Sequence, residues 1–101
     1  MVQEKILLEH SRNVKDILTL NWINENVQVL IDKINEFVLE SNDWNGYQMM
    51  DIERIEDLVS KGNGFYSFMI FNIEDGIEKQ WYVEANYKNS ELQIDDIIIC
   101  A

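Results

Sequence analysis

The chain has 101 residues, and its 47% hydrophobic content is enough to build the core of a single domain over residues 1–101. Nineteen acidic residues against eight basic ones leave a net charge of −11, which argues against direct binding to nucleic acid. The sequence contains no apolar run near the roughly 20 residues that span a bilayer, and residues 1–10 lack the features of a signal peptide. We therefore expect a cytoplasmic protein.

The first 24 residues fit two secondary structures. Leu7, Val14, Ile17 and Leu18 follow a helical spacing, whereas Ile17–Ile23 also alternates tolerably as a strand. We favour a helix and keep the strand as the alternative.

Residues 25–40 predict the clearest helix of the chain. Asn24 precedes it as a candidate N-cap, and Glu25 suits the positive end of the helix dipole. The apolar residues recur at the spacing of a single helix face: Val27, Leu30, Ile31, Ile34, Phe37 and Val38.

A polar loop over 41–47 is followed by a second apolar pattern. Ile52, Ile55, Leu58 and Val59 predict a short helix over 51–61. Asp51 is its candidate cap, and Gly62 can adopt the left-handed conformation that ends a helix.

From Gly64 onward the apolar period changes to two, which predicts strands. Residues 65–73 are apolar on both faces, as in a central strand covered on both sides. Asp75-Gly76 indicates a tight type I′ turn into a second strand over 77–87. Lys88-Asn89-Ser90 is a further turn, and the last strand, 92–100, loses its apolar phase at Asp95-Asp96, where we expect a bulge.

These elements predict an α+β fold. Its antiparallel sheet has three or four strands, arranged as a C-terminal meander packed against two or three N-terminal helices.

No motif for catalysis or metal binding is present. His10 is the only histidine and Cys100 the only cysteine, and no residues around them form a nucleophile–base arrangement. A calcium loop starting at Ser41 would lack the carboxylates required at its first and twelfth positions, the latter being Ile52. We expect no enzyme activity, no metal and no cofactor.

The acidic composition instead indicates recognition of a basic protein. Aromatic and carboxylate side chains interleave on the polar face of the strand over 77–87, and anchors of this kind suit a protein interface. The candidate partner-binding residues are Asp43, Trp44, Asp75, Glu78, Tyr82 and Glu84.

We therefore predict a bacterial inhibitor of the immunity-protein type, a monomer or homodimer, that occludes the active site of a basic toxin such as a nuclease. One alternative is a ligand-binding or enzymatic domain whose pocket is lined by Phe65, Phe68, Phe71, Trp81 and Tyr87. Another is a structural subunit that completes its sheet with a second chain.

Overall fold

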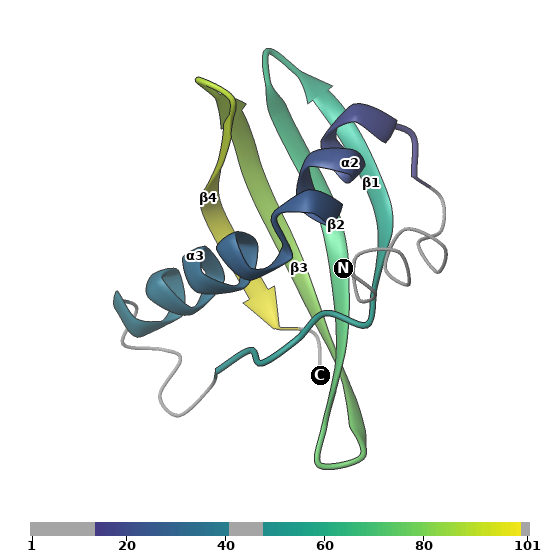
Figure 1. Ribbon diagram of the computed structural model, residues 1–101, viewed down its shortest axis with the longest axis vertical. Helices are drawn as coiled ribbons and strands as arrows, with labels where there is room; N and C mark the ends of the chain where they lie inside the picture. Colours follow the sequence, from purple (N-terminus) through teal and green to yellow (C-terminus); the bar gives the residue numbers. More distant parts are fainter. Residues whose placement is uncertain (1–13, 41–47, 100–101) are drawn as a thin grey trace.

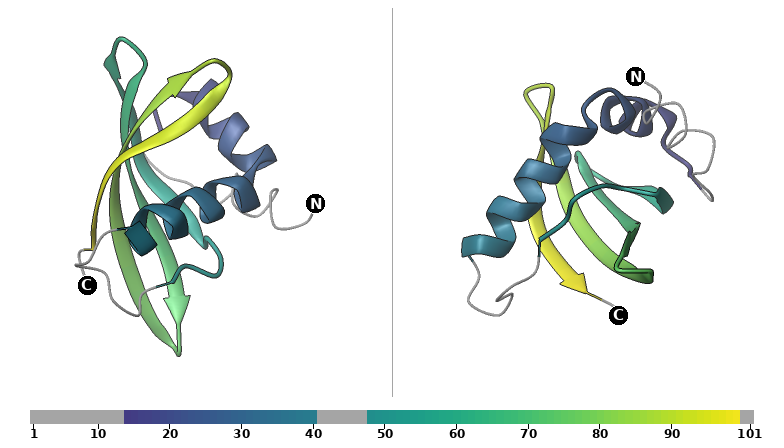
Figure 2. Two further views of the ribbon diagram at one scale, coloured as in Figure 1. Left: turned by 90° about the vertical axis from the view of Figure 1, so that its left-hand side faces the viewer. Right: turned by 60° about the horizontal axis from the view of Figure 1, so that its bottom comes forward.

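The computed structural model describes residues 14–40 and 48–99, in which two helices pack on one face of a four-stranded antiparallel sheet (Figures 1 and 2). Each strand pairs with the next, in the order β1-β2-β3-β4. The predicted α+β class and C-terminal meander are confirmed. None of the helices in these two ranges is long and apolar enough to cross a membrane. The elements are α2 (Ile17–Glu25), α3 (Val27–Glu40), β1 (Arg54–Gly62), β2 (Phe65–Glu74), β3 (Ile77–Lys88) and β4 (Glu91–Ile99).

The helix favoured for the first 24 residues is confirmed from Ile17 onward, as α2, while residues 1–13 of that prediction lie outside the described residues. Asp16 caps it by accepting a hydrogen bond from the Thr19 amide at 2.8 Å. The predicted start of the next helix is wrong, because Asn24 and Glu25 belong to the end of α2. Only Asn26 separates the two helices, and its carbonyl accepts the Leu30 amide at 3.0 Å. The buried stripe of α3 is confirmed at Val27, Leu30, Ile31, Ile34 and Val38.

The helix predicted over 51–61 is wrong, since this segment forms β1. Ile55 and Leu58 are both fully buried although three residues apart, a spacing that a regular strand would place on opposite faces. A bulge between Glu56 and Val59, with Asp57 at a φ of 56°, inserts one extra residue and turns both side chains inward. The resulting apolar spacing of three resembles that of a helix.

The bulge predicted at Asp95-Asp96 is confirmed in β4. Ala85 faces Ile94 and Glu84 faces Asp96, so Asp95 is the extra residue. The predicted turns are also confirmed: Asp75 and Gly76 have φ values of 54° and 78°, and positive φ values occur again at Asn89 and Ser90.

The core lies between the helices and the inner face of the sheet, where Phe68, Trp81 and Val83 are fully buried. The segment before β1 is attached to α3 by Asn35. Its Nδ2 donates to the Met49 carbonyl at 2.8 Å, and its Oδ1 accepts the Met49 amide at 2.7 Å. These bonds satisfy backbone groups of the chain as it crosses from the helix layer to the sheet.

The two-sided cover predicted for β2 is found on one side only. Both described helices lie against the inner face, and neither covers the opposite face of the sheet (Figure 2). Phe65 and Ile73 of β2, which lie on this second face, are about half exposed. We call this second surface the open face.

Gly64 and Gly76 both lie in turns with positive φ but differ in the atoms around them. Alanine substitutions at the two positions therefore make a matched pair that tests the effect of a close contact on stability. A Cβ on Gly64 (φ 82°) would lie 3.0 Å from the Tyr87 carbonyl oxygen, whereas one on Gly76 (φ 78°) would meet nothing within 4 Å. We expect Gly76→Ala to cost about 1 kcal/mol for its left-handed backbone, and Gly64→Ala about 2 kcal/mol because the close contact adds to that strain. Urea unfolding of both variants measures the difference, and equal losses would contradict the predicted contact.

Candidate partner-binding surface

The open face brings together three of the predicted partner-binding residues. Glu78, Tyr82 and Glu84 lie on it at alternate positions of β3, as the period of two predicted. Tyr82 faces Met69 of β2 on one side and Ile98 of β4 on the other. Tyr82 is half-buried and Ile98 is 51% exposed, so this part of the face presents apolar surface to solvent.

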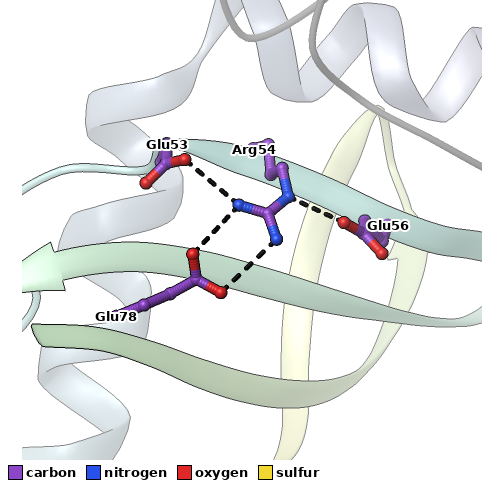
Figure 3. Close-up of polar contacts among 4 residues, drawn as sticks. All are labelled: Glu53, Arg54, Glu56 and Glu78. Atoms are coloured by element: carbon purple, nitrogen blue, oxygen red, sulfur yellow. Dashed lines mark hydrogen bonds and ion pairs between the residues drawn. The ribbon is translucent and has the colours of Figure 1, made fainter.

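On the open face, Arg54 of β1 lies at the centre of a cluster of three glutamates (Figure 3). Its Nε donates to Glu56 at 2.7 Å, and its Nη1 reaches Glu53 at 3.1 Å. Nη1 and Nη2 also each contact a carboxylate oxygen of Glu78 at 3.4 Å. The hydrogen bond to Glu56, followed by that to Glu78, raises the pKa of Arg54 further above its ordinary value, against the opposing effect of burial. The side chain is therefore always charged.

The same guanidinium covers an aromatic ring on the side of the sheet away from α2 and α3. Its central carbon lies 4.0 Å from the centroid of the Phe71 ring, and Phe71 is only 7% exposed. Through this cation–π contact, the charged Arg54 side chain shields the Phe71 ring from solvent, as an apolar side chain would in a packed core. It contributes to the burial of Phe71 on the open face.

Lys61 of β1 forms an ion pair with Glu84. Its Nζ donates to Glu84 at 3.1 Å and to the Tyr82 hydroxyl at 3.3 Å. The hydrogen bond to Glu84, and then that to Tyr82, raises the pKa of Lys61. Both ends of this ion pair are exposed, with 45% of the Lys61 side chain and 41% of the Glu84 side chain accessible to solvent.

Further carboxylates extend the surface onto β4. Asp96 lies opposite Glu84 in the strand register and is exposed. Asp95, the bulged residue, accepts a hydrogen bond from Nδ2 of Asn86 at 2.8 Å. Among residues 48–99, carboxylates therefore outnumber cations on the open face, and apolar side chains lie among them.

The remaining predicted residues lie elsewhere. Asp75 is exposed in the β2–β3 turn, which projects from the sheet at the bottom of Figure 1, so it lies at one end of the open face. Asp43 and Trp44 lie outside the described residues, as does most of the calcium-like loop. No structural role is assigned to them.

Sequence reasoning missed Arg54 and Lys61 as members of this surface. Both lie in the segment 51–61 that the apolar spacing predicts as a helix, which does not bring them beside the acids of β3. Had residues 54–62 been recognised as a strand, their cations would have faced the acids of β3 across β2. The signal was present but was hidden by the helix-like spacing of Ile55 and Leu58.

The residues predicted to line a ligand pocket lie on both sides of the sheet. Of these residues, Phe68 and Trp81 are fully buried in the core, and Phe71 lies on the other side of the sheet under Arg54. A groove of about 240 Å³ lies instead between α3 and β4, with mostly polar and charged walls. Within residues 14–40 and 48–99 no three His, Cys, Asp or Glu side chains are arranged to hold a metal ion. The groove is lined by Lys33, Glu36, Phe37, Glu40, Gln93 and Ile94.

Comparison of the chain with known protein families, with curated proteins and with solved structures finds no match in any of the three.

Proposed function

We propose that this protein is an acidic inhibitor of a basic protein, acting in the bacterial cytoplasm in the manner of an immunity protein that neutralises a nuclease-type toxin. Its open face is the contact surface. Inhibition is by occlusion: the acidic face covers the cationic surface with which a nuclease holds phosphates, and no bond is made or broken.

The observation that supports this proposal most directly is the composition of the open face around Tyr82. An aromatic ring and the exposed Ile98 lie side by side, and the carboxylates of Glu84 and Asp96 border them. Apolar anchors surrounded by charge of one sign suit a partner of the opposite sign, since the anchors supply contact energy and the charges steer association. With a net charge of −11, the whole protein adds to that steering.

Isolation of the partner tests the proposal first. The tagged protein, used to capture proteins from its native host, is expected to retain one basic protein. Kinetic measurements on the purified pair should show an association rate constant that falls roughly tenfold or more between 20 and 300 mM NaCl. Recovery of no basic protein, or association insensitive to salt, would contradict the proposal.

A pair of charge-matched double variants then tests the contact surface. Replacing Glu78 and Glu84 together by Gln is expected to slow association with the captured partner by about 3–10-fold, because both carboxylates lie on the open face. The control replaces Glu25 by Gln and Asp32 by Asn, two exposed acids of the helices, and changes net charge equally. Equal slowing by the two variants would exclude the open face as the contact surface, and thermal unfolding confirms that both are folded.

A further inference from the structure

The open face has two parts that differ in how firmly their charges are held. At the Arg54 end of β1, Arg54 is 16% exposed and Glu56 19% exposed, and the guanidinium contacts three carboxylates and an aromatic ring. At the other end of β1, Lys61 pairs with Glu84 of β3, and both partners are more than 40% exposed. The ion pair between Arg54 and Glu56 is largely buried, whereas that between Lys61 and Glu84 lies in solvent.

The chemistry of the two cations strengthens this difference. A guanidinium donates several hydrogen bonds in one plane, so Arg54 cannot leave without breaking all of them. An ammonium is a compact, strongly hydrated charge on a flexible chain, and exposed pairs of this kind contribute little to stability. Water can therefore replace Glu84 around Lys61 at small cost.

Glu84 lies near a second carboxylate, so the single positive charge of Lys61 does not neutralise both. Asp96 lies directly opposite Glu84 in the register, an arrangement of like charges that is unfavourable between paired strands. Asp96 uses one carboxylate oxygen to accept the Ile97 amide of its own strand at 2.9 Å. A second cation at this position would relieve the repulsion between the two carboxylates.

We propose that Lys61 occupies, in the free protein, the position that an arginine of the basic partner takes in the complex. This inference rests on the proposed function and specifies how its surface works. The partner's guanidinium lies between Glu84 and Asp96, against the ring of Tyr82, and Lys61 swings out into solvent. An apolar neighbour of that arginine packs on Ile98.

Arginine fits this position better than lysine for two reasons. Its planar group can bond two carboxylates at once, whereas an ammonium acts as a single point of charge. It can also stack on the face of an aromatic ring, and Tyr82 is the next residue to Glu84 on the open face of β3, with Ile98 beside it on β4. The partner chemistry is therefore an arginine beside an apolar side chain on an exposed segment.

A peptide titration tests this inference without the natural partner. The probe is a capped octapeptide of alternating arginine and leucine, and the control probes replace arginine by lysine or by glutamate. Binding is followed by amide chemical shifts of the isotopically labelled protein at low salt. We expect the arginine peptide to bind most tightly, with the largest shift changes at Tyr82, Glu84, Asp96 and Ile98.

Removal of Lys61 supplies the decisive comparison. Lys61→Gln is expected to lower the dissociation constant of the arginine peptide by about 2–5-fold, because the peptide no longer displaces an internal cation. Lys15→Gln changes the net charge equally at an exposed residue that precedes α2, and should change the dissociation constant much less. Thermal unfolding of both variants should match that of the parent protein.

Three outcomes would overturn the inference. They are equal strengthening by Lys61→Gln and Lys15→Gln, shift changes centred on the Arg54 side or on the helices, and absence of arginine-peptide binding at millimolar concentration. The salt-dependent capture of a basic protein decides separately on the proposed function. If that capture succeeds while the peptide results fail, the protein is an acidic inhibitor whose surface does not use Lys61 in this way.

Discussion

Replacement of Arg54 by methionine is expected to destabilise the protein by about 2–3 kcal/mol and to lower Tm by about 10–20 °C. Methionine retains the length of the side chain but removes the guanidinium that lies between Glu53, Glu56 and Glu78. The three carboxylates then repel one another without a cation, and the Phe71 ring loses its cation–π partner. The loss is smaller than for a fully buried ion pair because the side chain is partly exposed.

Two control variants separate these causes. Arg54→Lys keeps the charge and loses the planar bonding, so it should lie between the parent protein and Arg54→Met. Lys61→Met removes a cation from the same face at an exposed pair and should leave Tm almost unchanged. High salt should restore part of the stability of Arg54→Met by screening the glutamates. If Arg54→Met unfolds at the same temperature as Lys61→Met, the guanidinium has no special structural role.

The bulges explain why one strand was predicted and another was not. Both β1 and β4 contain an extra residue that places two apolar side chains, three residues apart, on the inner face. In β4 the pair is Ile94 and Ile97, and three consecutive isoleucines favoured a strand, so the phase change indicated a bulge. In β1 the pair is Ile55 and Leu58, surrounded by charged residues, and the same spacing matched a helix. The pairing of residues 54–62 with β2 makes this segment a strand rather than a helix. A local sequence pattern contains no information about that pairing.

The residues of the candidate surface could be predicted only on the strands that were themselves predicted. Glu78, Tyr82 and Glu84 were placed on one face because β3 alternates without a bulge. The cations that face them come from β1, across β2, and their position depends on the register shift at Asp57. An arrangement that joins residues 24 positions apart, such as Arg54 and Glu78, requires the sheet topology and cannot follow from local spacing.

A hydrogen bond inside the core gives the second large effect. Trp81 is fully buried, and its indole Nε1 donates to Oδ1 of Asn72, which is 1% exposed, at 2.8 Å. We expect Asn72→Leu to cost about 2–3 kcal/mol, because leucine has a similar volume but removes this acceptor from a buried donor. Trp81→Phe should cost a comparable amount, since it leaves the buried Asn72 oxygen without this donor and opens a cavity.

A double-mutant cycle distinguishes the hydrogen bond from packing. With both partners replaced, neither polar group remains buried without the other, so the double variant should lose about 1–2 kcal/mol less than the sum of the two single variants. Urea unfolding monitored by circular dichroism provides the four free energies, and Asn72→Asp serves as a further variant that keeps an acceptor but buries a charge. Additive losses would mean that the two side chains act independently. Coupling of the expected size would show that the hydrogen bond between Trp81 and Asn72 helps to fix β2 against β3, at a place where sequence patterns predict only apolar packing.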